Sequence, residues 1–161
     1  AANYVTKFDG ASIAIAGGYS EAKNQTVDAD DFERMAAAVS VTAGPVNVRA
    51  SYHEREEVST ISTGVTATQG QETVEIGAKY TMGANAFSLV LIDAEAVADT
   101  GQAQDGDEMT TIIAAYKRTL GPGVTWSISA LTADADDGLI TGTSANSNSG
   151  EAIMSRFQLK W

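Results

Sequence analysis

The stretch "TVEIGAKYTM" (residues 73–82) alternates between two kinds of side chain. Its apolar members are Val74, Ile76, Ala78, Tyr80 and Met82, and its polar members are Thr73, Glu75, Lys79 and Thr81. A period of two is the repeat of a β-strand, because successive side chains of a strand point to opposite faces of the sheet. We therefore expect a strand with one apolar and one polar face.

The same two-faced pattern recurs along the chain. Val48, Ala50 and Tyr52 alternate with Asn47, Arg49, Ser51 and His53, and Val124, Trp126, Ile128 and Ala130 alternate with Thr125, Ser127 and Ser129. The patterns predict strands at Tyr4 to Phe8, Ala11 to Ala22, Glu33 to Ala43, Val46 to Glu56, Thr73 to Met82, Phe87 to Ala96, Met109 to Leu120, Val124 to Ala133 and Ala152 to Trp161. Most are about 10 residues long, enough for a tilted strand to cross a bilayer.

The connections between these strands fall into two classes. Three Thr-x-Gly triplets, at residues 42–44, 81–83 and 119–121, lie 38 to 39 residues apart and open the tight turns "GPVN", "GANA" and "GPGV". Glycine and proline supply the φ values that hairpin turns need. The other connections are long and polar: "NQTVDADDF", "VSTISTGVTATQGQE", "TGQAQDGDE" and "DDGLITGTSANSNSG". Short turns are therefore expected at one end of the sheet and long loops at the other.

Composition excludes several classes of protein. The net charge of -11 and the absence of cysteine argue against nucleic-acid binding, disulfide scaffolds and thiolate sites. The sequence contains no run of about 18 apolar residues, so it predicts no membrane helix. Such a search does not detect membrane strands. The opening "AANYVTKF" has neither Met nor a leader pattern, so we expect a mature or trimmed chain.

Two environments can receive the apolar strand faces. A soluble sandwich fills its core with bulky side chains, whereas here the apolar faces are rich in Ala and Gly, with aromatic residues near strand ends. Lipid requires apolarity without close packing and favours aromatic girdles, so the pattern favours a membrane barrel. Asp93 is an exception, because it shares a face with Phe87, Leu89 and Leu91. We interpret it as a register change or as the strand leaving the membrane.

Four stretches give the chain a resemblance to a known family. They are "NYVTKFDGASIAIAGGYS", "ETVEIGAKYTMGANAFSL", "AAYKRTLGPGVTWSISALTADADDG" and the terminal "RFQLKW". In them the chain resembles the carboxyl-terminal half of a Gram-negative outer-membrane general porin, most closely the alphaproteobacterial type. The resemblance implies an all-β, antiparallel transmembrane β-barrel with about 8 to 9 strands in this chain, half of a 16-stranded porin.

The family's properties follow as expectations. The chain (residues 1–161) is a single barrel domain or barrel half in the bacterial outer membrane, part of a homotrimer that contacts lipid and lipopolysaccharide. It forms a water-filled channel for passive diffusion of small hydrophilic solutes and ions. The barrel-assembly machinery recognises a terminal strand of alternating apolar residues, here Ile153, Phe157, Leu159 and Trp161. Trp161 departs from the usual Phe, and the family's inward-folded constriction loop belongs to the other half.

Charged residues on the polar faces are candidates for the pore lining: Arg49, His53, Glu75, Lys79, Lys117 and Arg156. In a lumen such residues bias ion flow. The alternative is that each is a solvated wall residue without a role in selectivity.

Three acidic clusters suggest a loop-bound divalent cation such as calcium, or plain solvated loops: Asp28, Asp30 and Asp31; Asp105, Asp107 and Glu108; and Asp134, Asp136 and Asp137. The segment "DADDGLITGTSA" lacks the sixth-position Gly and the twelfth-position acid of an EF-hand. His53 is the single histidine, which excludes a multi-histidine metal site within the chain. No catalytic motif or organic cofactor site is predicted, so we do not expect an enzyme.

Two other functions remain open on the sequence. One is a small, filled eight-stranded outer-membrane barrel that serves as an anchor or adhesion protein. The other is a soluble extracellular β-sandwich that serves as a binding module.

Overall fold

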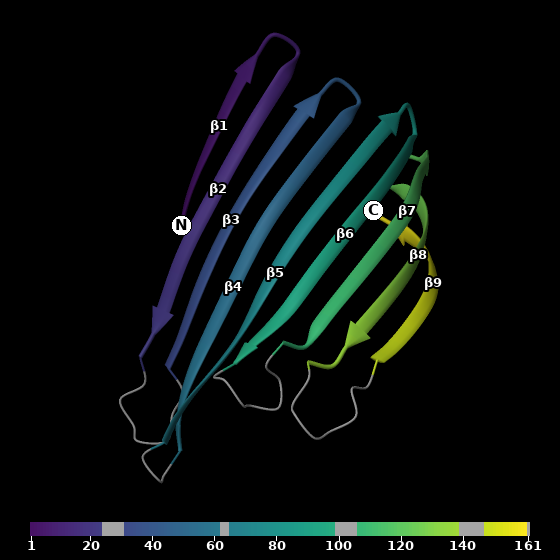
Figure 1. Ribbon diagram of the computed structural model, residues 1–161. Helices are drawn as coiled ribbons and strands as arrows, with labels where there is room; N and C mark the ends of the chain where they lie inside the picture. Colours follow the sequence, from purple (N-terminus) through teal and green to yellow (C-terminus); the bar gives the residue numbers. More distant parts are fainter. Residues whose placement is uncertain (24–30, 62–64, 99–105, 139–146, 161) are drawn as a thin grey trace.

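The computed structural model describes residues 1–23, 31–61, 65–98, 106–138 and 147–160. These residues form nine antiparallel strands in one sheet, paired in chain order (Figure 1). The strands are β1 (Ala2–Phe8), β2 (Ala11–Ala22), β3 (Asp31–Ala43), β4 (Val46–Ile61), β5 (Val65–Met82), β6 (Asn85–Ala98), β7 (Glu108–Gly121), β8 (Val124–Asp136) and β9 (Ser147–Leu159). Among the described residues, no helix is long and apolar enough to cross a membrane.

Four tight turns lie at one end of the sheet, at residues 9–10, 44–45, 83–84 and 122–123. Gly10, Gly44, Gly83 and Gly123 adopt positive φ values of 73°, 54°, 58° and 72° in these turns. The structure confirms the turns predicted at the first two Thr-x-Gly triplets. In the third, Gly121 still belongs to β7, where the register shifts, and Gly123 takes the positive φ.

The strands extend further from the turns than the sequence predicts. Residues 58–72 were expected to form a long loop, but β4 continues to Ile61 and β5 begins at Val65. The backbone pairing of the two strands continues to Ile61 and Val65. The prediction of a long loop was wrong here because the segment is polar at most positions, so it lacks alternation although its backbone is paired.

The described strands form a single layer without a hydrophobic core. Among residues whose side chains are described, only Ala94 (6% exposed) and Ser51 (4% exposed) are buried. A β-sandwich needs a second sheet and a core about 10 Å thick between the two. The described part of the chain has neither, so the structure argues against the sandwich alternative.

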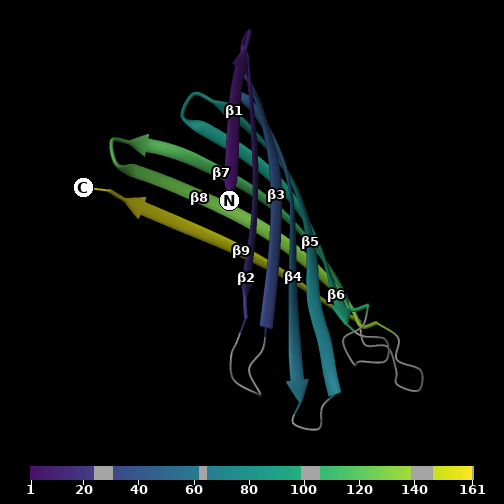
Figure 2. The same cartoon turned by 90° about the vertical axis from the view of Figure 1, so that its left-hand side faces the viewer.

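The sheet is open, with β1 at one edge and β9 at the other (Figures 1 and 2). Within the described residues, β1 pairs with β2 alone and β9 pairs with β8 alone. Nine successive antiparallel strands make β1 and β9 run in the same direction, so these two edges cannot join as an antiparallel pair. The structure therefore does not support a small closed barrel of eight strands, and it fits the wall of a larger one.

Candidate pore wall

The two faces of the sheet differ in chemistry, and along β6 they also differ in exposure. Along β6, every residue of one face from Ala86 to Ala96 is half-buried or buried, and every residue of the other face from Phe87 to Val97 is exposed. Side chains converge on the concave side of a curved sheet and diverge on the convex side. We call the face of Ala86 to Ala96 the concave face and the face of Phe87 to Val97 the convex face. The cross-strand pairing then assigns the residues of all nine strands to one face or the other.

The convex face carries a continuous apolar band. One row of directly opposed residues crosses eight strands without a polar member: Ile13, Val41, Val48, Ala78, Leu89, Ala114, Ala130 and Ile153. Ile76 is 51% exposed in the neighbouring row, and Leu89 is 55% exposed. Apolar surface of this extent marks an interface with another apolar phase or partner.

Aromatic side chains line the band on the side of the tight turns. The ring centroids of Phe87 and Tyr116 lie 5.1 Å apart, those of Tyr116 and Trp126 lie 5.9 Å apart, and those of Trp126 and Phe157 lie 6.4 Å apart. The Trp126 indole N–H donates to the Ser155 hydroxyl (2.9 Å). Aromatic side chains that expose one polar atom to water are typical of the girdle at a membrane–water interface.

Carboxylates end the band on the opposite side. Glu54, Glu72, Glu95, Glu108 and Asp136 are directly opposed on five neighbouring strands of the convex face, and we call them the carboxylate row. Asp93 lies one position closer to the band and accepts a hydrogen bond from the Thr110 hydroxyl (3.1 Å). The register of β6 is unbroken on both sides, so Asp93 marks where the strand leaves the band rather than a register change.

All six predicted pore-lining residues lie on the concave face. Their strands are β4 for Arg49 and His53, β5 for Glu75 and Lys79, β7 for Lys117 and β9 for Arg156. The first four lie on the neighbouring strands β4 and β5. Lys117 and Arg156 lie nearer the turns, with Ser127 between them in the same row.

The structure adds four charged residues that the sequence analysis did not assign to this face: Lys7, Arg34, Arg55 and Glu57. Arg34 and Arg55 are directly opposed on β3 and β4. Continuing the alternation of β4 beyond His53 places Arg55 and Glu57 on the same face as Arg49. Only the register shows that Arg34 lies opposite Arg55.

Charge is strongly segregated between the two faces. Seven of the chain's ten Lys and Arg residues lie on the concave face of the described strands, with two carboxylates, Glu57 and Glu75. Twelve carboxylates lie on the convex face, where Arg118 is the one basic strand residue in the described ranges: Glu21, Asp31, Glu33, Glu54, Glu56, Glu72, Asp93, Glu95, Glu108, Asp134, Asp136 and Glu151. The concave face is therefore cationic although the chain as a whole is acidic.

Few of the concave cations are neutralised. Arg55 forms an ion pair with Glu57, and the guanidinium of Arg34 lies 5.0 Å from the ring centroid of Phe32. Within the described ranges, Arg49 and Lys79 have no carboxylate at ion-pair distance. No carboxylate in these ranges therefore neutralises the charges of Arg49 and Lys79 on the concave face.

Polar and apolar regions divide the concave face. Asn47 donates hydrogen bonds to the hydroxyls of Ser40 (2.8 Å) and Thr42 (2.7 Å), which fixes a polar patch on β3 and β4. Across β6 to β8 the row that contains Ser40 and Arg49 becomes apolar, with Val90, Ile113 and Leu131 directly opposed. The cations thus concentrate on β3 to β5.

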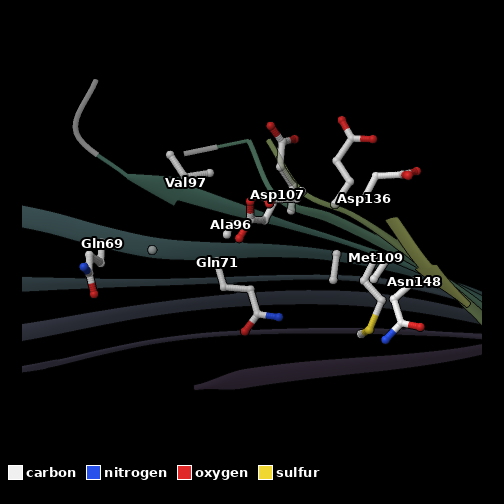
Figure 3. A pocket seen from close by; sticks show the side chains of 14 residues that line it. Gln69, Gln71, Ala96, Val97, Asp107, Met109, Asp136 and Asn148 are labelled. Atoms are coloured by element: carbon white, nitrogen blue, oxygen red, sulfur yellow. The ribbon is translucent and has the colours of Figure 1, made fainter. Parts of the chain in front are cut away.

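A hollow at the end opposite the turns is formed by β5 to β9 (Figure 3). Gln71, Met109 and Asn148 extend from one side of the sheet there, and Asp136 extends from the other (Figure 3). Asp107 accepts a hydrogen bond from the Gly138 N–H at 2.8 Å. The described residues contain no group of three or more acidic or histidine side chains placed to hold a metal ion.

The calcium prediction stays untested. Asp28, Asp30 and Asp105 lie outside the described residues.

A family model described as Gram-negative porin matches residues 1–138 of the chain. The chain belongs to the Gram-negative porins. The match covers β1 to β8, and β9 continues the same sheet. Comparison with curated proteins and with solved structures gave no match. The porin is thus an outer-membrane protein whose strands are transmembrane.

The terminal strand of the porin presents three residues of its predicted signature on the convex face. Ile153, Phe157 and Leu159 lie on the convex face and are 79%, 70% and 63% exposed. Trp161 lies outside the described residues. Recognition of this signature by the assembly machinery stays a prediction.

The carboxylate row predicts that neutralising one member stabilises the porin. Glu95 lies directly opposite both Glu72 and Glu108, and like charges in such pairs are destabilising by up to about 1 kcal/mol each. We expect Glu95→Gln to raise the urea midpoint of the detergent-solubilised porin in the presence of a chelator. Glu151→Gln is the matched control because Glu151 lies opposite Thr132. Equal shifts in the two variants would contradict the explanation.

Proposed function

We propose that the chain forms part of the wall of a water-filled channel through the outer membrane. Small hydrophilic solutes and ions cross this channel by passive diffusion, without catalysis. The observation that carries the proposal is a single-layered sheet with lipid-compatible side chains on its convex face and charged side chains on its concave face. A concave polar wall provides water and charges to solutes that lipid excludes.

Closure of the barrel requires further strands. Because β1 and β9 run in the same direction, an antiparallel barrel is completed by an odd number of additional strands, which gives an even total. Sixteen strands satisfy this condition, and barrels of that size hold an aqueous channel. Lipopolysaccharide contact, the assembly machinery and a homotrimer are the partners that the porin resemblance adds to the proposal.

Planar-bilayer recording of the purified porin tests the proposed channel. We expect stepwise increases in conductance, each persisting while the voltage is held low. An anchor or adhesion protein gives a heat-modifiable band on a detergent gel but no conductance steps. That combination would overturn the channel and retain the outer-membrane barrel.

A further inference from the structure

We propose that this part of the wall makes the channel prefer anions to cations. The proposal rests on the proposed channel function and names its solute class: small hydrophilic anions, inorganic or carrying a carboxylate or phosphate group. Net charge alone argues for the opposite preference, because the chain carries -11. Whether the channel prefers anions or cations depends instead on which charges lie on the concave face and which lie on the convex face.

The lumen experiences the concave charges most strongly. The twelve convex carboxylates lie on the far side of the sheet, at the lipid surface or in the water beyond it. At 0.1 M salt the Debye length is about 10 Å, so charges across the wall are screened more than charges that line it. A cleft lined by one sign of charge concentrates ions of the other sign.

The basic residues of the concave face form a track along β3 to β5. Arg49 and Arg55 lie six residues apart on β4, which spans about 20 Å along the strand. Lys79 extends the track on β5 toward the turns, because it lies two residues from Gly77, which faces Arg49. Glu75 is the one carboxylate within the track, since Glu57 is already paired with Arg55.

The end of the track away from the turns contains a hollow suited to an anion. Arg34, His53, Arg55 and Thr73 are among the residues that line it, and Glu54 of the convex face borders it as well. Arg34 and Arg55 are directly opposed there, and like charges in directly opposed positions repel each other. An anion beside the two guanidinium groups reduces this repulsion.

The test is the reversal potential of the complete porin in a planar bilayer under a KCl gradient. We expect the wild-type channel to favour chloride. Arg49→Glu and, separately, Lys79→Glu are expected to shift the chloride-to-potassium permeability ratio at least about threefold toward potassium at 0.1 M salt. The shift should shrink at 1 M salt, where the Debye length is about 3 Å.

Arg118→Glu is the matched control, because it makes the same charge change on the convex face. We expect this variant to leave the permeability ratio unchanged. Arg49→Gln provides a milder variant if the reversed charge prevents folding, and it should shift the ratio in the same direction by a smaller factor.

The outcomes separate the proposal from the channel function. Conductance steps with a wild-type preference for potassium, or with ratios unaffected by the concave variants, overturn the anion preference and leave the channel intact. An equal shift in Arg118→Glu also overturns it, because net charge then explains the effect. Absence of conductance in the wild type removes the channel and the inference together.

Discussion

Leu89→Arg is expected to prevent most of the porin from inserting into lipid vesicles. Leu89 is 55% exposed on the convex face, and its cross-strand neighbours in the band are Ala78 and Ala114. An arginine near the bilayer midplane of a transmembrane barrel costs roughly 2–4 kcal/mol. This is a large part of a folding free energy of about 5–15 kcal/mol. The heat-modifiable fraction on a detergent gel after refolding into vesicles measures the effect.

Ser88→Arg is the control for that experiment. Ser88 precedes Leu89 on β6 but lies on the concave face, opposite Lys79 and Ala115. There the new guanidinium group remains in water, and its main energetic cost is electrostatic repulsion from Lys79. We expect Ser88→Arg to insert nearly as well as the parent. Equal insertion of the two variants would mean that the faces have been assigned wrongly.

Gly123→Ala is expected to destabilise the final hairpin strongly. Gly123 has a φ of 72°, and a Cβ atom there would lie 2.2 Å from the Lys160 carbonyl oxygen. The Lys160 N–H donates to the Gly123 carbonyl oxygen at 2.8 Å, so the methyl group displaces the chain that holds β9 to the turn. Backbone strain of this kind costs on the order of 1–3 kcal/mol, and the clash adds to it.

Gly10→Ala separates the two contributions to this effect. Gly10 has a φ of 73° in the β1–β2 turn, but no atom lies within 4 Å of the position that a Cβ atom would occupy. Backbone strain is therefore the only destabilising effect expected in this variant. Urea unfolding of the detergent-solubilised porin should show a clearly greater loss of free energy for Gly123→Ala than for Gly10→Ala. Similar losses would show that Lys160 moves aside without cost.

The sequence predicted the faces of the strands better than their ends. Inside the apolar band, residues such as Ile76 and Leu89 alternate with polar residues, as the proposed arrangement with lipid on one face and water on the other requires. Beyond the band, at Glu72 and Asp93, the convex face carries carboxylates, and the alternation disappears while the backbone pairing continues. This is why β4, β5 and β9 are longer than predicted.

The candidate site was predicted in part for the same reason. All six predicted pore-lining residues occupy the concave face. They lie in strands whose apolar–polar alternation is clear or whose pairing follows chain order: Arg49, His53, Glu75, Lys79, Lys117 and Arg156. Arg34 and Arg55 each lie one residue inside the end of a predicted strand. That they face each other depends on the pairing of β3 with β4, which a single sequence does not specify. The segregation of charge between faces likewise depends on pairing across all nine strands.

Site-directed thiol labelling tests most directly whether the concave face lines the water-filled lumen. The chain contains no cysteine, so single substitutions along β6 report one position at a time. With the porin in sealed lipid vesicles and a charged, membrane-impermeant thiol reagent, we expect Ser88→Cys and Val90→Cys to react and Leu89→Cys and Leu91→Cys to remain unlabelled. Labelling of the Leu89 and Leu91 positions instead, or of all four positions equally, would contradict the assignment of the concave face to the channel.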